Sequence, residues 1–444
     1  MLHMRTVLKI IFDAALAAVA PDNALLRHLR LDNGWLYADA QRWQLQGRMV
    51  RVLGAGKGVA PMAHAVENLL GDWLHEGLVV VKYGHGLPLE RIRQLEAGHP
   101  VPDANGVTAT AELLRLAAAC GPDDLLICLL TGGASALTPA PADKLTLADL
   151  QETTRLLLEC GATIQQLNAV RKHLSSFGGG QLARAANDAE VCSIIVSDVV
   201  GDPLDVIASG PTAPDPSTFA DCQHIINQFG LENRLPESVR QRLAEGLTGQ
   251  LPETPKPGDP LFGRVLNVLA ATNKQALDAA ALAASEAGYE PVILTDRMTG
   301  EARLKAAELV ATAKLWQQQA KSKRFCLLAG GETTVTIKGN GLGGRNQEMA
   351  LAAALALEGN KGICALFAGT DGTDGPTDAA GGYAFADSTM RMGGHTAATA
   401  FLEKNDSNAA LKRSGDILLT GPTRTNVMDL AILLVTEDDN LSAY

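Results

Sequence analysis

The residue types best suited to chemistry begin in a glycine-rich turn near residue 55. In the stretch "VLGAGKGVAP", Gly54, Gly56 and Gly58 occupy alternate positions, and Lys57 lies between the last two. An apolar strand, a glycine turn and a helix from about Val59 are predicted here. The free N–H groups and the positive end of such a helix attract an anion, and Lys57 would add a full positive charge. The stretch therefore predicts a phosphate-binding turn, and a glycine turn with a solvated lysine is the alternative.

Two common nucleotide-binding fingerprints do not fit this turn. The dinucleotide motif GxGxxG or GxGxxA needs a third small residue, but Val59 stands there. The next strand-like run ends in Lys82 and Tyr83, whereas a dinucleotide site needs an acid that binds the ribose hydroxyl. The Walker A motif is absent as well. An NAD site is disfavoured, and an NADP site is left open.

A second glycine turn follows the apolar run "LLICL". In "LLTGGASALTP", backbone N–H groups at Gly132 and Gly133 could cradle a phosphate, and Ser135 would supply a hydroxyl. An ordinary turn between a strand and a helix is the alternative.

Two aspartates follow the next predicted strand. In "SDVVGDPLDVIASGPT", Asp198 lies at the strand end and Asp202 four residues later. Ligands bind at the carboxyl ends of parallel strands, and Mg²⁺ prefers hard oxygen ligands of this type. Either Asp198 or Asp202 is therefore a candidate magnesium ligand, with turn-forming aspartates as the alternative.

The second half of the chain holds a denser set of polar residues. In "GGETTVTIKGNGLGGRNQEMAL", Glu332 precedes Arg345, whose guanidinium fork could bind a carboxylate or phosphate at the start of an apolar helix. In "AGTDGTDGPTDAAGG", Asp371, Asp374 and Asp378 share one loop. Their spacing fails the calcium-binding EF-hand pattern. They are candidates to orient a hydroxyl or a metal, and solvated turn aspartates are the alternative.

Composition excludes several other classes of protein. The net charge of −11 argues against a general nucleic-acid surface, which is basic. No HExxH pair and no GxSxG motif occur, so a zinc enzyme and a serine hydrolase of the usual type are disfavoured. No apolar run is long enough to span a membrane. The seven cysteines form no CxxC pair and are predicted to be buried free thiols, which indicates a reducing, cytoplasmic location.

The elements that must position these residues alternate between strands and helices. Continuous apolar runs predict parallel strands covered on both faces, at "RMVRVLGAG", "GLVVVKYG", "DLLICLLTGG" and "VCSIIVSD". Thr146 with Asp149 and Thr163 with Gln166 resemble capping boxes that begin helices. The N-terminus could be a signal peptide, but Asp13 interrupts its apolar run, so an amphipathic helix is expected.

A linker is predicted at residues 251–263, where "LPETPKPGDPLFG" contains four prolines. We expect two α/β domains, residues 1–255 with a parallel sheet and residues 262–444. Helices are predicted at 273–287 and 300–319, with strands at "RVLNVLAA", "YEPVILTD", "RFCLLAGG", "GICALFAG" and "GDILLTG".

Taken in order, eight stretches between about residues 50 and 430 resemble the class II glycerate 2-kinases, whose second half is called the MOFRL domain. They are "GAGKGVAPMA", "EAGHPVPDANG", "LLTGGASAL", "NAVRKHLS", "SDVVGDPLDVIASGPT", "GGETTVTIKGNGLGGRNQEMAL", "AGTDGTDGPTDAAGG" and "LLTGPTRTNV". The resemblance implies a Rossmann-like larger domain, a second α/β domain and a cleft between them. It also implies transfer of the γ-phosphoryl group of ATP, with Mg²⁺, to the 2-hydroxyl of D-glycerate. Lys57 would be the phosphoryl-stabilising cation and Arg345 the clamp for glycerate or phosphate.

Three positions depart from the family pattern. Gly178 stands where lysine is common, and Arg424 and Met428 stand where glycine and asparagine are expected. Two other functions are weighed against the kinase: an NAD(P)H-dependent hydroxypyruvate reductase, a label that relatives often bear, and a non-catalytic sensor of sugar acids. The sequence leaves the oligomeric state open.

Overall fold

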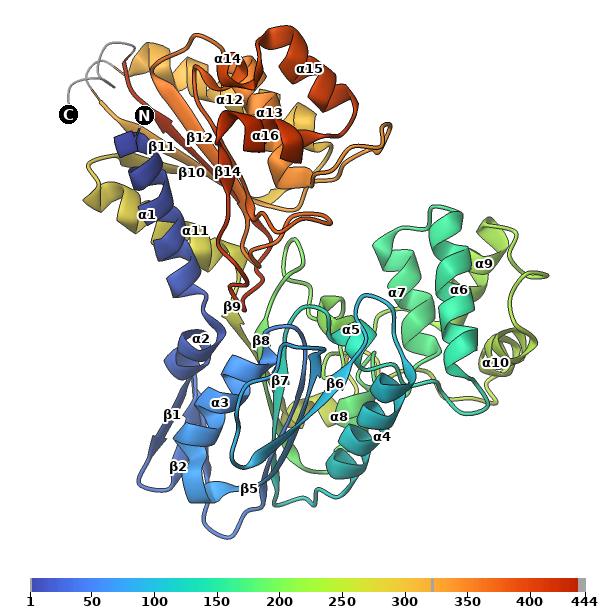
Figure 1. Ribbon diagram of the computed structural model, residues 1–444. Coiled ribbons are helices and arrows are strands. Elements are labelled where there is room, and N and C mark those ends of the chain that lie inside the picture. Colours follow the sequence, from blue (N-terminus) through green and yellow to red (C-terminus); the bar gives the residue numbers. More distant parts are fainter. Residues whose placement is uncertain (1, 321–322, 438–444) are drawn as a thin grey trace. The chain divides into compact units, whose positions relative to one another are not determined.

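The structure is a computed structural model that describes residues 2–320 and 323–437 (Figure 1). The chain divides into two compact units. Pro21–Ser197 and Asp202–Ala270 form the first, called here the N-terminal unit. The first 20 residues, Asp198–Gly201 and the chain from Ala271 onward form the second, called here the C-terminal unit. Both units contain a six-stranded sheet with helices, so the predicted α/β fold class is confirmed.

The sheet of the N-terminal unit has the order β6-β5-β4-β7-β8-β9. Its strands are β4 (Val50–Ala55), β5 (Leu74–Lys82), β6 (Ile92–Ala97), β7 (Leu125–Leu130), β8 (Glu190–Val196) and β9 (Val265–Ala271). Strands β4 to β8 pair in parallel, and every residue of β4 and β7 is buried. These are the continuous apolar runs of the sequence. Because the strands are parallel, the turns after β4, β6 and β7 lie at one edge of the sheet.

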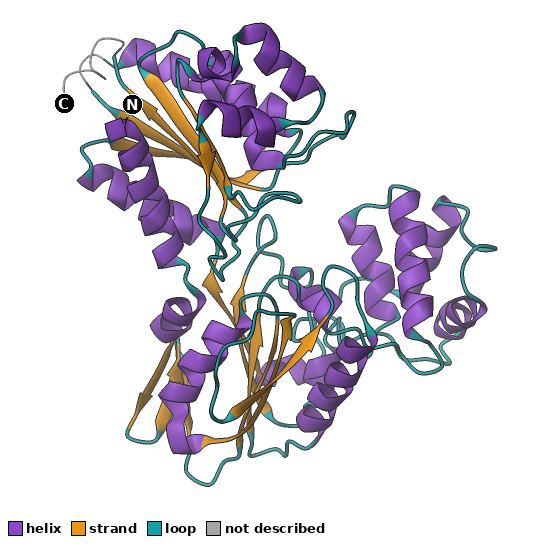
Figure 2. Cartoon of the chain, in the orientation of Figure 1, coloured by secondary structure: helices purple, strands orange, loops and turns teal. Residues whose placement is uncertain are grey.

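The helices of the N-terminal unit lie in two groups. Those near the sheet are α2 (Pro21–His28), α3 (Val59–Leu70), α4 (Ala104–Ala118), α5 (Ala134–Leu137) and α8 (Gln181–Ala185). A separate cluster consists of α6 (Leu147–Glu159), α7 (Ile164–His173), α9 (Phe219–Gln228) and α10 (Glu237–Leu247), which bury a core of their own (Figure 2). Both predicted capping boxes, at Thr146 and Thr163, are present. A small antiparallel sheet that the sequence analysis did not predict is formed by β1 (Leu29–Asp32), β2 (Trp35–Ala38) and β3 (Gln41–Gln44).

The sheet of the C-terminal unit is mixed, with the order β10-β11-β15-β12-β13-β14. Its strands are β10 (Glu290–Met298), β11 (Phe325–Gly331), β12 (Ile363–Gly369), β13 (Gly381–Ala384), β14 (Ile417–Leu418) and β15 (Asp429–Val435). Its helices are α1 (Leu2–Ala18), α11 (Asn273–Glu286), α12 (Ala302–Gln319), α13 (Arg345–Ala356), α14 (Ser388–Met392), α15 (His395–Glu403) and α16 (Ser407–Ser414). Strand β15, which the sequence analysis did not predict, is antiparallel to both β11 and β12. A short apolar run of this kind does not by itself distinguish a strand from a buried helix.

The two units differ in two places from the predicted domains, residues 1–255 and 262–444. Helix α1 belongs to the C-terminal unit, where it buries Leu8 and Phe12 and where Thr425 Oγ1 donates to Val19 O over 2.7 Å. Strand β9, expected in the second domain, forms an edge of the first sheet beside β8. Both differences have the same cause. The unit that α1 or β9 joins depends on where its apolar face finds a complementary surface, and not on its position along the chain.

Candidate active-site residues

The glycine turn after β4 packs tightly against the turn after β7. A Cβ at Gly56, where φ is +138°, would lie 2.0 Å from Thr131 Oγ1. Thr131 Oγ1 accepts a hydrogen bond from Gly58 N over 3.0 Å, and Lys57 N donates to Gly132 O over 2.9 Å. The backbone donors predicted to cradle an anion at Lys57 and Gly58 are therefore already bonded within the protein. The Lys57 side chain is therefore the candidate of this turn to bind an anion.

The second turn brings Lys57 beside a histidine. A Cβ at Gly133, where φ is +88°, would lie 3.0 Å from Lys57 Cγ and 3.1 Å from the His99 ring. Only glycine leaves room for both side chains at this point. Burial lowers the pKa of His99 to about 4, with further contributions from the charges of Lys57, Lys82 and His85. His99 is therefore a neutral imidazole at neutral pH.

An arginine that sequence reasoning missed contacts the same turn. Arg171, on the last turn of α7, donates from Nη2 to Ser135 O over 3.4 Å. The Ser135 hydroxyl lies 2.8 Å from Ser209 Oγ. Arg171 is part of the "NAVRKHLS" stretch, and a run of three basic residues at a helix end was the available signal.

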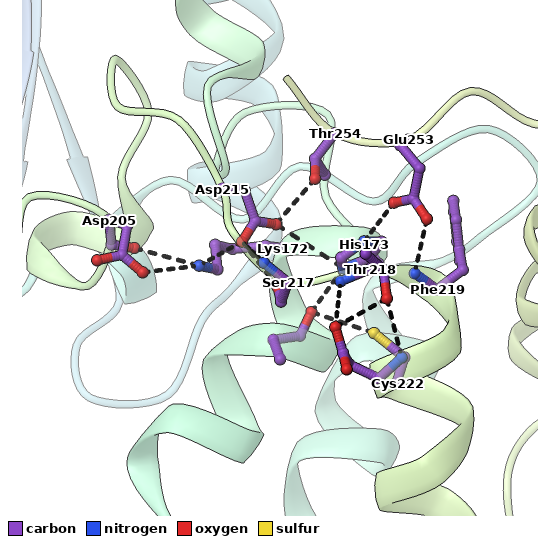
Figure 3. A network of polar contacts seen from close by, with 12 residues as sticks. Lys172, His173, Asp205, Asp215, Ser217, Thr218, Phe219, Cys222, Glu253 and Thr254 are labelled. Atoms are coloured by element: carbon purple, nitrogen blue, oxygen red, sulfur yellow. Dashed lines mark hydrogen bonds and ion pairs between the residues drawn. The ribbon is translucent and has the colours of Figure 1, made fainter. Parts of the chain in front are cut away.

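A network of buried charges holds the residues that follow Arg171 (Figure 3). Lys172, which is 3% exposed, lies 2.7 Å from Asp215 Oδ1 and 3.3 Å from Asp205 Oδ2. His173 contacts Glu253 through Nε2 over 3.0 Å. Burial alone raises the pKa of Asp215, but Lys172 and Ser217 outweigh burial, and the pKa lies below its usual value. The C-terminal end of α7 is therefore anchored at several points.

The turn that joins this network to Ser135 has an unusual backbone. Ala208, Ser209 and Gly210 are consecutive residues with φ between +55° and +62°. Two of them carry a Cβ, and such a conformation costs of the order of 1 kcal/mol or more for each. Strain of this kind persists where the surroundings over-determine it, as they do here through the hydroxyl contact of Ser209.

In the C-terminal unit, Arg345 is held between two carboxylates. Its Nε and Nη2 donate to the two oxygens of Asp429 over 2.5 and 3.0 Å, and Nη1 lies 2.9 Å from Glu332 Oε1. Burial alone lowers the pKa of Arg345, but the charge and hydrogen bonds of Asp429 outweigh burial and raise the pKa. Asp429, 1% exposed at the start of β15, was missed because β15 was not predicted. The sequence signal for Asp429 was an acidic residue directly before an apolar run.

The loop aspartates of this unit do different things. Asp374 accepts hydrogen bonds from the N–H groups of Asn346 and Gln347, at 3.1 and 2.8 Å, and so caps α13. Burial raises the pKa of Asp374 despite these bonds. Asp371 accepts from Thr373 N over 3.1 Å, and Asp378 is exposed. Asp374 therefore caps α13 and is buried, whereas Asp371 is only partly buried.

The candidate metal ligands fall in different units. Asp198 belongs to the C-terminal unit, where Asn426 Nδ2 donates to its Oδ2 over 3.4 Å. Asp202 belongs to the N-terminal unit and has a φ of +56°. Across residues 2–320 and 323–437, no group of three or more His, Cys, Asp or Glu side chains could hold a metal ion. The same part of the chain contains no helix long and apolar enough to cross a membrane.

Comparison with known proteins places this arrangement in a family. Residues 7–244 match the family model described as a domain of unknown function, DUF4147, and residues 325–429 match the MOFRL family. A D-glycerate 2-kinase of Thermotoga maritima is 41% identical over 87% of this chain and 90% of that protein. The crystal structure of glycerate kinase from T. maritima superposes with a TM-score of 0.86 at 38% identity, covering 98% of this chain and 100% of that one.

The chain belongs to the class II glycerate 2-kinase family. A family relative from Agrobacterium vitis, provisionally named a hydroxypyruvate reductase, is 42% identical over 97% of this chain and 94% of that protein. The family has therefore been given two different enzyme names.

The structure explains what two of the departures from the glycerate 2-kinase pattern do. Arg424 and Met428 have φ of +63° and +69°, in the left-handed region that glycine and asparagine tolerate best. This chain carries a strained residue at both positions. At Gly178 a Cβ would lie 3.1 Å from Ser209 O, so a larger side chain there requires the Ser209 turn to shift.

Proposed function

We propose that this protein is a glycerate 2-kinase that transfers the γ-phosphoryl group of ATP to the 2-hydroxyl of D-glycerate, releasing ADP and 2-phospho-D-glycerate. The observation that carries the proposal is the Lys57 side chain beside the Gly132–Gly133 turn, in a chain that matches a D-glycerate 2-kinase over most of its length. All seven cysteines are free thiols, which supports a cytoplasmic location.

Phosphoryl transfer depends on placing the reactants and neutralising charge on the phosphoryl oxygens. Lys57 is proposed to supply that charge. Its neighbour His99 is neutral, so it adds no charge to the site, but its imidazole can form a hydrogen bond with the anion. The Gly132, Gly133 and Ser135 turn is proposed to lie against the phosphate chain of the nucleotide.

Arg345 is proposed to bind glycerate or phosphate through its outer edge. Asp429 and Glu332 occupy one N–H on each guanidinium nitrogen. A guanidinium has five N–H groups, which leaves one each on Nη1 and Nη2 for ligand oxygens. Because two acids already balance its charge, Arg345 would orient a ligand more than it would attract one.

Mg²⁺ is proposed as the companion of ATP. Magnesium in kinases is held by one or two carboxylates together with phosphate oxygens and water, so a preformed cage of three acids is not required. Asp198 or Asp202 would supply the carboxylate, and both offer the hard oxygens that the ion prefers. The bound ion would neutralise charge on the phosphates.

The alternative name in the family, hydroxypyruvate reductase, calls for a dinucleotide site. In such a site the second glycine lets the backbone approach the pyrophosphate. Here the space beside Gly56 is filled by Thr131, at 2.0 Å from a would-be Cβ. This packing favours the kinase.

A paired assay on the purified protein tests the proposal. ADP release from MgATP with D-glycerate is measured beside NAD(P)H oxidation with hydroxypyruvate, and enolase is used to detect the 2-phosphate product. The kinase predicts glycerate-dependent ADP release, and NAD(P)H oxidation alone would contradict it.

Lys57→Ala and Arg345→Ala should each lower turnover by about 10²-fold or more. Lys274→Ala removes an exposed lysine that pairs only with Asp278 in the described chain, and it should leave turnover unchanged. Near-wild-type turnover in both active-site variants would refute the assigned roles.

A further inference from the structure

Arg171 carries a charge that the described residues do not balance. Its one hydrogen bond there is to a backbone carbonyl, Ser135 O, and no carboxylate in residues 2–320 and 323–437 lies within 4 Å of its guanidinium. The next residue, Lys172, contacts two carboxylates, and so does Arg345. Arg171 therefore differs from Lys172 and Arg345, whose charges carboxylates balance.

An unbalanced cation in a partly buried position has an energetic cost. Arg171 is half-buried, and burial lowers the pKa of its guanidinium with no neighbouring acid to offset the effect. A bound anion removes that cost, and the planar fork of arginine matches the geometry of a carboxylate. The side chain is thus suited to a ligand that brings its own negative charge.

The positions of Arg171 and Lys57 on the same turn indicate which class of anion could bind Arg171. Both residues contact the turn formed by residues 131–135: Lys57 at Gly132 and Gly133, and Arg171 at Ser135. In a 2-hydroxy acid the carbon that bears the hydroxyl is bonded directly to the carboxylate carbon. A cation for the carboxylate must therefore lie close to the cation that stabilises the phosphoryl group arriving at the hydroxyl.

We propose that Arg171 binds the carboxylate of the hydroxy-acid acceptor and so restricts the enzyme to 2-hydroxy acids. This inference rests on the proposed kinase function. Ser135 and Ser209, whose hydroxyls are 2.8 Å apart, would supply further polar contacts to the ligand.

The fold holds Arg171 where this role requires it. Lys172 and His173 are fixed by Asp215, Asp205 and Glu253, as Figure 3 shows. Arg242 on α10 donates from Nε to His173 O over 2.8 Å and ties the end of α7 to the helical cluster. The arginine therefore meets its ligand with little loss of backbone freedom.

The test combines kinetics with direct binding. Arg171→Gln should raise the KM for D-glycerate by 10- to 100-fold, on the order expected for one lost charged contact, while the KM for ATP stays within about 2-fold. Arg171→Lys should recover part of the loss. Glyceramide replaces the carboxylate by a neutral amide, so its KM in the wild-type enzyme should be higher than the KM for glycerate. In Arg171→Gln the two KM values should be similar.

Arg242→Gln is the matched control, because Arg242 is a partly buried arginine of α10 that bonds to the end of α7 and makes no proposed ligand contact. Lys172 and His173 keep their acidic partners in this variant, so the end of α7 stays anchored. Its KM for glycerate should stay within about 2-fold of wild type. A tenfold rise in this control would mean that Arg171→Gln acts by loosening the helices, and it would overturn the proposal. A rise in the KM for ATP alone in Arg171→Gln would overturn it as well, since Arg171 would then contact nucleotide phosphate.

Calorimetric binding of D-glycerate separates this inference from the proposed function. If the wild-type protein binds glycerate without turnover, and Arg171→Gln binds it at least tenfold more weakly, the carboxylate site stands while the kinase proposal fails. If glycerate-dependent turnover is present but binding is unchanged in Arg171→Gln, the carboxylate site is refuted and the kinase stands. If the wild-type protein shows neither binding nor turnover, both are refuted.

Discussion

The closeness of His99 and Lys57 leads to a prediction about the pKa of His99 that can be tested without substrate. Lys57 Cγ and the His99 ring both approach the same point beside Gly133, at 3.0 and 3.1 Å. Burial is the largest cause that lowers the pKa of His99 to about 4, and the charge of Lys57 is the next. Replacing Lys57 by methionine keeps most of the length of the side chain and removes the charged ammonium group.

The size of the expected change follows from Coulomb's law. For two unit charges separated by about 6–8 Å in an effective dielectric of about 20–80, the repulsion is roughly 0.5–3 kcal/mol. One pH unit corresponds to about 1.4 kcal/mol. Because His99 is partly exposed to solvent, the lower half of this range applies, and the pKa of His99 in Lys57→Met should rise by about 0.5–1 unit.

The measurement is an NMR titration of the histidine Cε1–H resonances between pH 5 and 8, with His99→Gln used to assign the signal. In the wild-type protein the His99 resonance should stay at its neutral position down to about pH 5, since its pKa is about 4. In Lys57→Met it should begin to move within the same range. Lys274→Met should leave it unchanged.

The same shift affects stability in a defined direction. The ordinary pKa of His99 is 6.5 and its folded value is about 4, so the folded state binds the proton more weakly. The contribution to stability is therefore complete above pH 6.5 and is lost as the pH falls toward 4. A wild-type His99 that titrates near 6.5, or a resonance unchanged by the loss of Lys57, would refute the reasoning.

Two further predictions concern stability. Arg424→Gly relieves backbone strain at an exposed position with φ of +63°, and it should raise the free energy of unfolding by about 0.5–1 kcal/mol. The gain should appear as a rise of about 1–4 °C in Tm, whereas Arg424→Ala should give no gain. Lys172→Met leaves Asp215, which is fully buried, without its cation and should cost about 3–5 kcal/mol in urea unfolding. Lys9→Met removes an exposed pair and should cost at most about 0.5 kcal/mol. An equal gain from both Arg424 variants would contradict the strain argument, and a loss below about 1 kcal/mol for Lys172→Met would contradict the buried-pair argument.

Local sequence determined much of this protein. The apolar runs at β4 and β7 specify strands buried on both faces, and the Thr146 and Thr163 capping boxes mark helix starts, because these signals act between residues close in the chain. The glycine turns that carry Lys57 and Ser135 were recognisable for the same reason. The eight stretches that match the glycerate 2-kinases in order along the chain indicated the family, and the comparisons with known proteins support it.

Tertiary structure alone decided which of these residues meet. His99 and Arg171 are distant in sequence from Lys57. His99 reaches the turn because parallel strands end at the same edge of the sheet, and Arg171 reaches it because buried charges anchor the end of α7. Asp429 became the partner of Arg345 because β15 inserts between β11 and β12. The attachment of α1 to the C-terminal unit likewise depends on packing between surfaces far apart in the chain, and a local pattern has no information about where its partner surface will be.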